Sequence, residues 1–561
     1  MPRATTLPSQ TIASGPGHLH AIKPVGAVCH GSTYDAEACS AARKNQYSSV
    51  WRSANPAAVE WPNWEAWPEQ GQSCYIDTEK STPCGQGRVS LYSLQAQSPE
   101  DIQAGVRFAH KHNLRVAIRN TGHDFAGRSV APESLQINTH LMTDKKVHKK
   151  FKPAGCNGTD EGLAVTVGAG VQLYDMYKWL GEHDVMVVGG SSHGVGITGG
   201  YIQGGGHSML SAIGGMGSDN ALEFTVVTAD GRHVVANSYQ NTDLFWALRG
   251  GGGGTWGVVT SVTVRAFKDP PMVTFSLTGG APFGNESYWE AVERFHAFLP
   301  EFNDAGGNMY YWLMPDLKDP GLGHVSVITA SGGFGNQSSK AAIDKLIKPL
   351  VKELSEITGT PFNYTSILSP KSAITYAETN KAPDKAGQRV ILGSRIVTRD
   401  FLKSSEGPGK VTAALRSMRT YHGESVEGQN AIQGLVVAGP AVRANADKVD
   451  SALHPIWRKA LLHIVLARGW DADATVAVQQ EVQRNLTEVE VPILKSLEPG
   501  EGGGAYLNEA DGYEENFQDS FWGSNYPRLY ELKQKLDPEN LFIVRRGVGS
   551  EDWDAEGLCR K

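Results

Sequence analysis

The chain has 561 residues, of which 40% are apolar and 20% charged, and its formal net charge is −7 at pH 7. This length exceeds what one hydrophobic core usually organises, so two or more lobes are expected in an ordinary soluble globular protein. The acidic balance without a dense Lys/Arg block excludes nucleic acid as a first choice of partner. No run of about eighteen apolar residues occurs, which argues against a membrane-spanning helix.

The six cysteines form two close pairs and two isolated residues. Their spacing predicts the disulfides Cys29–Cys39 and Cys74–Cys84, and leaves Cys156 and Cys559 to pair or stay free. None belongs to a C-x-x-C pair, so no metal site is predicted. Short disulfide loops indicate an oxidising compartment.

A secreted, extracellular protein is therefore predicted, although Met1 to Gly17 lacks the apolar core of a signal peptide. Either the chain starts after processing or the gene start lies elsewhere. Five N-x-S/T sequons agree with secretion, although each alone is weak. They begin at Asn157, Asn285, Asn336, Asn363 and Asn485.

Four regions follow one another along the chain. Residues 1–88 are rich in Pro, Trp, Cys and Ser, and we interpret them as a disulfide-stapled extension. In residues 89–270 short strands alternate with helices and glycine loops. Residues 271–500 mix amphipathic helices with alternating strands, which indicates a second domain. The tail, residues 501–561, is predicted to return to a strand and a final helix.

Within the second region a strand is predicted at 89–94, a helix capped by Ser98 that runs to about His112, and a strand at 114–119. A hairpin with its turn at Asp230-Gly231 follows. The second domain should contain a helix at 339–357 and strands at 309–313 and 461–467. The tail should contain a strand from Ala505 and a helix at 527–536.

A small-residue loop, Arg119-Asn120-Thr121-Gly122-His123-Asp124, directly follows a predicted strand. Backbone N–H groups of such a loop can converge on an anion such as a pyrophosphate. The histidine would then lie beside whatever the phosphates anchor. The alternative is a plain exit from a strand with a solvated histidine.

A second glycine-rich segment extends from Gly189 to His207. Gly194 to Gly199 spells the dinucleotide fingerprint G-x-G-x-x-G, and the residues around Ser192 spell the hydrolase elbow G-x-S-x-G. Both motifs must open a helix, and three further glycines before His207 disfavour one. We predict extended backbone that a large flat ligand approaches closely.

A third segment, Asp243 to Thr260, joins a short amphipathic helix to five glycines and a buried-type strand. Alone it could be a flexible hinge. Three glycine-rich segments within one region favour a shared binding surface instead.

These segments together resemble the berberine bridge enzyme-like branch of the vanillyl-alcohol oxidase flavoproteins, especially fungal members described as isoamyl alcohol oxidases. The resemblance rests on the ordered motifs R-x-x-G-H, G-G-x(3)-G-G-G, D-L-F-W-A-L-R-G-G-G and Y-x-N, the last at Tyr506 to Asn508. It covers residues 89–270 and about 500–555. It implies an α+β fold: a two-lobed PCMH-type FAD-binding domain at 89–270, and a substrate domain at 271–500 with an antiparallel sheet covered by helices. Residues 501–561 would return to the FAD domain.

The resemblance also implies the cofactor and its contacts. In the family, FAD is bonded through its 8α carbon to the histidine that matches His123, while glycine loops lie along the flavin. The side chains of Tyr506 and Asn508 would lie on one face of a strand and point toward the flavin. The residues expected to contact FAD are Arg119, Asn120, Thr121, Gly122, His123, Asp124, Gly190, Ser191, Ser192, Val195, Gly196, Gly199, Gly200, Tyr201, Gly206, Asn220, Gly257, Val258, Val259, Tyr506 and Asn508.

Two positions depart from the family. Ser192 stands where many relatives carry a cysteine bonded to the flavin C6, so a single attachment is expected. Glu509 stands where plant relatives continue Y-x-N with tyrosine, which leaves the catalytic base open.

The predicted function is an oxidase that passes a hydride from an alcohol or similar small molecule to FAD, with O2 reduced to hydrogen peroxide. The candidate base is Tyr506, acting with His454 or His463; alternatively Tyr506 only packs on the flavin. Val195, three residues after Ser192, matches the family's oxygen gate beside the flavin C4a. A monomer without nucleic-acid or membrane partners is expected.

Two other functions remain open at this stage. One is a flavin-binding protein of low turnover, or a dehydrogenase that uses another acceptor. The other is a serine hydrolase at Ser192. Residues 271–500, where the substrate domain is expected, carry no motif that is diagnostic of a particular substrate.

Overall fold

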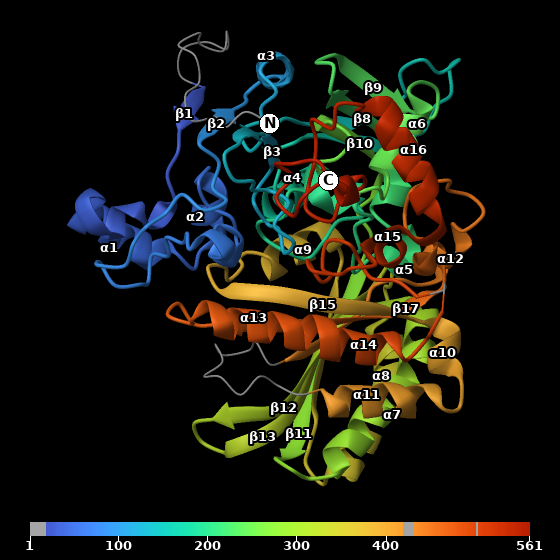
Figure 1. Cartoon of the computed structure of the whole chain (residues 1–561). Coiled ribbons are helices and arrows are strands. Elements are labelled where there is room, and N and C mark those ends of the chain that lie inside the picture. The colour runs from blue at the N-terminus through green and yellow to red at the C-terminus, as the bar shows by residue number, and fades with distance from the viewer. Residues whose placement is uncertain (1–17, 419–430, 501–502) are drawn as a thin grey trace.

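The computed structural model describes residues 18–418, 431–500 and 503–561. The segment Met1 to Gly17, on which the signal-peptide question depends, lies outside them. Three β-sheets carry the described chain, two in the upper part of Figure 1 and one in the lower part. The predicted α+β class is confirmed.

The first sheet has the order β1-β2-β4-β3, with both neighbours of β4 parallel to it. The helix α3 (Pro99–Lys111) connects two of these strands, as predicted. It begins at a capping box, because Ser98 accepts from the Asp101 N–H while the Asp101 carboxylate accepts from the Ser98 N–H. The strands are β1 (Leu19–Ala21), β2 (Tyr92–Gln95), β3 (Val116–Arg119) and β4 (Leu135–Asn138).

The second sheet has the order β5-β6-β10-β8-β9, and β7 also pairs with β10. The predicted hairpin is β8 and β9, with Gly231 at a positive φ in the turn. The strands are β5 (Lys145–His148), β6 (Ala164–Gly168), β7 (Val185–Val187), β8 (Ala221–Val227), β9 (His233–Asn237) and β10 (Val258–Lys268); the helices of this part are α4 (Leu173–Glu182), α5 (Ser211–Gly214) and α6 (Thr242–Leu248).

The third sheet is antiparallel, with the order β14-β11-β13-β12-β16-β17-β15. Its strands are β11 (Met272–Pro282), β12 (Gly307–Asp319), β13 (Gly323–Gly335), β14 (Asn363–Ser369), β15 (Arg389–Thr398), β16 (Ile432–Val436) and β17 (Ala460–Trp470). All the elements predicted for this region are present. The predicted domain borders stay predictions, and the border near residue 270 falls between β10 and β11.

Helices cover one face of this sheet (Figure 1), as expected for the substrate domain. They bury the largest apolar cluster of the described chain against alternate strand residues. The helices that contribute to this cluster are α7 (Ser287–Asp304), α8 (Lys340–Thr358), α10 (Arg399–Lys403), α11 (Gly407–Ser417), α13 (Val476–Arg484) and α14 (Val491–Lys495). The helices α9 (Ser372–Thr379) and α12 (Pro440–Ala444) pack instead against α4 and α5.

The other face turns toward the first two sheets over β12, β15, β16 and β17. Because side chains alternate along a strand, Tyr310 and Trp312 on β12 point to this inner side, as do Gln433 and Leu435 on β16. This face forms one wall of the site.

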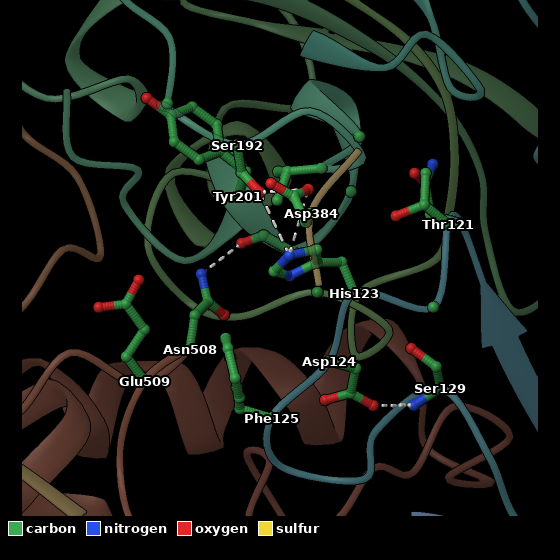
Figure 2. Close-up of a pocket in the computed structure, with 18 of the residues that line it drawn as sticks. Thr121, His123, Asp124, Phe125, Ser129, Ser192, Tyr201, Asp384, Asn508 and Glu509 are labelled. Atoms are coloured by element: carbon green, nitrogen blue, oxygen red, sulfur yellow. Dashed lines mark hydrogen bonds and ion pairs between the residues drawn. The ribbon is translucent and has the colours of Figure 1, made fainter. Parts of the chain in front are cut away.

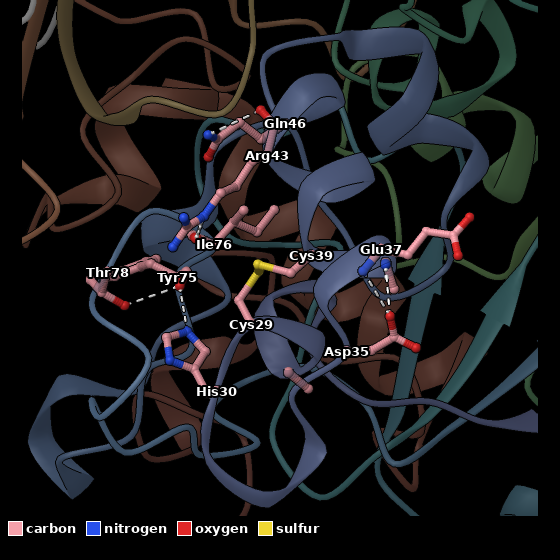
Figure 3. The surroundings of a disulfide bond; sticks show 12 residues. Cys29, His30, Asp35, Glu37, Cys39, Arg43, Gln46, Tyr75, Ile76 and Thr78 are labelled. Atoms are coloured by element: carbon pink, nitrogen blue, oxygen red, sulfur yellow. Dashed lines mark hydrogen bonds between the residues drawn. A yellow bond between two sulfur atoms is a disulfide. The ribbon is translucent and has the colours of Figure 1, made fainter.

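The N-terminal extension contains α1 (Ala36–Asn45) and α2 (Ser49–Ala54), which the sequence did not indicate. Both predicted disulfides are present, and Cys156 and Cys559 are free. Around Cys29–Cys39, His30 Nε2 lies 2.8 Å from the Tyr75 carbonyl oxygen, as Figure 3 shows. That contact ties one disulfide loop to the residue after Cys74.

The tail carries α15 (Phe517–Trp522) and α16 (Tyr526–Leu536), and Trp522 Nε1 donates to the Gly250 carbonyl oxygen in the third glycine segment. The predicted strand from Ala505 is wrong: only Gly504 forms an isolated bridge, with Ile396. Among the described residues, no helix is both long and apolar enough to cross a membrane.

Candidate functional site

A cavity of about 780 Å³ lies between the glycine-rich segments and the inner face of the third sheet. This volume is within the range of ligand and cofactor sites. All three glycine segments and the tail contribute to its wall, although they are far apart in the sequence. The cavity is therefore a product of the tertiary fold.

The glycines of this wall allow backbone segments to approach one another closely. A Cβ added at Gly196 would lie 1.8 Å from Asn120 Oδ1, and one at Gly253 would lie 3.1 Å from Gly200 Cα. Larger residues there would force the first, second and third segments apart. The segments thus form a common cradle with few side chains.

One expectation for the second segment is wrong. A short helical turn, η5 (Ile197–Tyr201), does form there, although Gly199 interrupts it with φ −76° and ψ −139°. Gly205 and Gly206 then have positive φ values. Neither the dinucleotide fingerprint nor the hydrolase elbow therefore opens the sustained helix that it requires.

His123 lies on the cavity wall with 15% of its side chain exposed. Its Nε2 is 3.3 Å from Ser192 Oγ and 4.0 Å from Asp384 Oδ2, as Figure 2 shows. Phe125 and Trp61 contact the imidazole edge-on. Burial lowers the pKa of His123, against the opposing effect of Asp384. The imidazole is therefore neutral and nucleophilic near neutral pH.

Asp384 comes from the loop before β15 and was not predicted. Its carboxylate accepts hydrogen bonds from Ser192 Oγ at 2.7 Å, from His193 N–H at 3.1 Å and from Gly194 N–H at 2.8 Å. Asp384 is an isolated aspartate in a loop that contains lysine and proline, and no motif around it indicates a functional site. The loop before β15 thereby fixes the second glycine segment beside His123.

A second charged cluster surrounds Glu509. Its Oε1 accepts from His207 Nε2 at 3.1 Å, and its Oε2 accepts from His463 Nε2 at 3.0 Å. Burial alone would raise the pKa of Glu509, but the two histidines outweigh it and hold that pKa well below its usual range. Glu509 is thus an ionised carboxylate on the cavity wall.

Tyr506 and Asn508 both line the cavity, but in a turn rather than a strand. Asn508 Nδ2 donates to the Gly200 carbonyl oxygen at 2.7 Å and to the Tyr506 hydroxyl at 2.8 Å. Burial raises the pKa of Tyr506, so its phenol is neutral.

The structure separates the predicted residues into two groups. Most line the cavity: Asn120, Thr121, Gly122, His123, Asp124, Gly190, Ser191, Ser192, Val195, Gly196, Gly199, Gly200, Tyr201, Gly257, Val259, Tyr506 and Asn508. Six do not: Arg119, Gly206, Asn220, Val258, His454 and His463.

The residues off the wall have other contacts. The Arg119 guanidinium donates to the carbonyl oxygens of Ala58 and Arg52, and so holds the extension. Asn220 donates to Gly214 and Met216 carbonyl oxygens. His454 Nδ1 accepts from the Ile456 N–H, and its Nε2 lies 3.1 Å from the Asp519 carbonyl oxygen. His454 therefore has no access to a molecule in the cavity.

Across 18–418, 431–500 and 503–561, no three His, Cys, Asp or Glu side chains are placed to hold one ion.

Comparison with known proteins identifies the class to which this fold and site belong, the FAD-linked oxidoreductases. The FAD binding domain family matches residues 91–237, and the berberine and berberine-like family matches residues 505–549. With the relatives described next, these matches place the chain in the berberine bridge enzyme-like family of vanillyl-alcohol oxidase-type flavoproteins.

Several relatives match over nearly the whole chain. An uncharacterized FAD-linked oxidoreductase of Arthroderma benhamiae is 49% identical over 97% of this chain and 92% of that protein. FAD-linked oxidoreductase malF of Malbranchea aurantiaca is 40% identical over 97% of this chain and 90% of that protein. The crystal structure of the VAO-type flavoprotein MtVAO615 from Myceliophthora thermophila C1 is 34% identical, with a TM-score of 0.85 over 97% of this chain and 95% of that one.

The residues on the wall fit FAD. Asn120 Oδ1 and Gln203 Oε1 are buried polar atoms without hydrogen-bond partners on residues that line the cavity, and a polar cofactor would supply partners. Gly200 and Gly254 present backbone without side chains to the same space, which suits a flat ring system.

Proposed function

We propose that this chain is an FAD-dependent oxidase that holds the cofactor through His123 alone. It would oxidise an alcohol or similar small organic molecule and reduce O2 to hydrogen peroxide. The position of a neutral His123 imidazole on the cavity wall carries the proposal, because that group can bond to a cofactor carbon. Ser192 beside it has a hydroxyl and no thiol, which supports single attachment.

Bound FAD would supply the redox chemistry by accepting a hydride and passing its electrons to O2. The chain's own residues would bind and orient the substrate and accept its proton. Leu392, Val465 and Ala467 give the third-sheet wall apolar surface. Tyr506 and Glu509 give one side of the cavity polar groups, and His463 lies behind Glu509. An alcohol bound beside them would be placed to lose both its hydride and its proton.

Val195 would be the residue that controls the access of O2 to the flavin. It lines the cavity between Gly194 and Gly196, and is only half-buried. A small side chain flanked by glycines leaves room for a small apolar molecule at the cofactor. This supports oxidase over dehydrogenase chemistry.

The hydrolase alternative loses support. Ser192 Oγ donates to Asp384 rather than to His123. In a Ser-His-Asp triad the histidine takes the serine proton while the aspartate orients the histidine. A flavin-binding protein of low turnover, or a dehydrogenase with another acceptor, remains the second candidate. Secretion is supported by the two disulfides, while a monomeric state stays a prediction.

The test uses the purified holoprotein and a panel of primary, secondary and aromatic alcohols. The expected result is a flavin spectrum that survives acid precipitation in the protein pellet, bleaching by at least one alcohol under anaerobic conditions, and peroxide release in air. Bleaching without peroxide would instead identify a dehydrogenase. No bleaching by any alcohol would overturn the proposed substrate class.

A further inference from the structure

We propose that His207 is the catalytic base of this site, and that Glu509 and His463 are its positioning residues. The inference deepens the proposed alcohol oxidation and rests on it. It identifies the atom that accepts the substrate proton as Nδ1 of His207. None of the bases predicted from the sequence, Tyr506, His454 and His463, combines access to the cavity with the required chemistry.

The contacts of His207 set its tautomer. Its Nε2 is 3.1 Å from Glu509 Oε1, and an ionised carboxylate only accepts, so Nε2 carries the hydrogen. Nδ1 is therefore the acceptor. The Tyr310 hydroxyl lies 3.5 Å from Nδ1, at the limit of a hydrogen bond. His207 lines the cavity with 9% of its side chain exposed, so a substrate hydroxyl can replace that weak contact.

Glu509 is suited to orient the imidazole. Both its oxygens accept from histidines, which leaves no free oxygen aimed at a substrate. Its negative charge stabilises the imidazolium that forms when His207 takes a proton, as the carboxylate does in histidine-carboxylate pairs. His463, with 1% of its side chain exposed, sits behind Glu509 and fixes it from the far side.

The phenols of the cavity are weaker candidates. The Tyr506 hydroxyl accepts from Asn508, and burial raises the pKa values of both Tyr506 and Tyr310. Neutral phenols do not take protons near neutral pH. The other histidine on the wall, His123, is assigned to the cofactor. An imidazole is the side chain whose pKa suits a base at this pH.

The substrate O–H bond breaks, its electron pair forms the C=O bond, and the proton forms an N–H bond at His207 Nδ1. The C–H bond breaks at the same carbon, and hydrogen leaves with both electrons to the oxidant, the flavin of the proposed function. The carbinol becomes a carbonyl, and His207 becomes an imidazolium paired with Glu509.

The first experiment does not depend on turnover. Nitrogen-15 spectra of histidine-labelled holoprotein would be recorded between pH 5 and 9, and His207 assigned by its loss in His207→Gln. The expected state at high pH has the hydrogen on Nε2. The charged and titratable neighbours that face His207 are Glu509, His463, Tyr310 and Tyr506, and of these Glu509 carries the negative charge. Glu509→Ala removes the acceptor at Nε2 and should therefore lower the fraction of His207 that carries its hydrogen there. Hydrogen on Nδ1 in the wild type, or an unchanged tautomer fraction in Glu509→Ala, would overturn the inference.

The second experiment measures anaerobic flavin reduction by whichever alcohol bleaches the wild type. His207→Gln should slow reduction by about 10²–10⁴-fold, with the covalent flavin and its spectrum retained, and His207→Gly should recover part of the rate on addition of imidazole. His324→Gln, at an exposed position on β13, is the matched control and should keep the wild-type rate. A wild type that no alcohol bleaches contradicts the proposed function, whereas a normal rate in His207→Gln contradicts only the base.

Discussion

The Ser192 hydroxyl donates a 2.7 Å hydrogen bond to Asp384 Oδ2, across a separation of 192 positions in the chain. Since that hydroxyl gives its hydrogen to Asp384, its oxygen is free to accept from His123 Nε2, 3.3 Å away. The chain of contacts Asp384–Ser192–His123 then favours the imidazole hydrogen on Nε2, which would leave Nδ1 for the proposed bond to FAD. A residue from the loop before β15 thus orients the proposed attachment group.

The first prediction concerns that attachment. FAD should remain with the wild-type protein after acid precipitation, and His123→Ala should release it. Peptide mapping should find flavin on the peptide that contains His123 and none at Ser192. Flavin that leaves the denatured wild type would contradict covalent bonding.

A second prediction separates orientation from attachment. Asp384→Asn and Ser192→Ala should each lower the covalently bound fraction of FAD, because the imidazole would lose the contact that selects its tautomer. Ser192→Thr keeps the hydroxyl and serves as the matched control. The measurement is the ratio of flavin in the acid pellet to flavin in the supernatant. Equal ratios in all four proteins would show that the chain of contacts has no part in attachment.

The third prediction tests the oxygen gate. Val195→Leu adds one methylene to a side chain on the cavity wall, and should slow reoxidation of the photoreduced flavin while sparing its reduction by substrate. Stopped-flow mixing with O2 measures the rate directly. Val195→Ala, which removes bulk, should reoxidise at least as fast as the wild type. An unchanged rate in Val195→Leu would remove the gate from the proposal.

A fourth prediction follows from Glu60, a buried carboxyl whose two oxygens have no hydrogen-bond partner. Burial raises the pKa of Glu60 from 4.5 to about 8. Below pH 4.5 the Glu60 carboxyl is protonated in both the folded and the unfolded chain, so its burial is fully tolerated. As the pH rises from 4.5 through 8, the unfolded chain ionises this group more readily than the folded chain, so the free energy of unfolding falls. Above pH 8 the folded state must hold an unpaired charge. Glu60→Gln should increase the free energy of unfolding at pH 8.5 and change it little at pH 5.

The measurement for Glu60 is chemical denaturation at the two pH values. Each pKa unit corresponds to about 1.4 kcal/mol, so a clear gain is expected at pH 8.5. Glu37→Gln, at an exposed position on α1, is the control. A gain of the same size at both pH values would point to packing instead of ionisation.

The fifth prediction concerns the extension. Replacing Cys29 and Cys39 together by serine should lower the free energy of unfolding by about 2–3 kcal/mol, because the short loop gains freedom in the unfolded chain. Thermal denaturation of the double variant measures the loss. Cys559→Ser, at an exposed free cysteine, should leave stability unchanged.

Local sequence patterns determined much of this protein. The capping box at Ser98, the Asp230-Gly231 hairpin and the two ten-residue disulfide loops each depend on residues that are close in the chain, so their spacing predicts them. The cradle formed by the glycine segments and the place of His123 beside it were also predicted from the sequence. Glycine is the residue that permits close backbone approach, so the residue types themselves indicate where such approach occurs.

The tertiary structure alone decided which side chains meet. Asp384 reaches Ser192 from the loop before β15, and Glu509 reaches His207 across 302 positions. His454 turns away from the cavity because its own turn and the Asp519 carbonyl hold both ring nitrogens. Such contacts depend on how the sheets pack against one another. The packing energy is spread over many apolar residues, and no sequence motif among them indicates which polar side chains will meet. The sequence therefore determined the cradle for the cofactor, and only the packed fold decided which groups serve the chemistry around it.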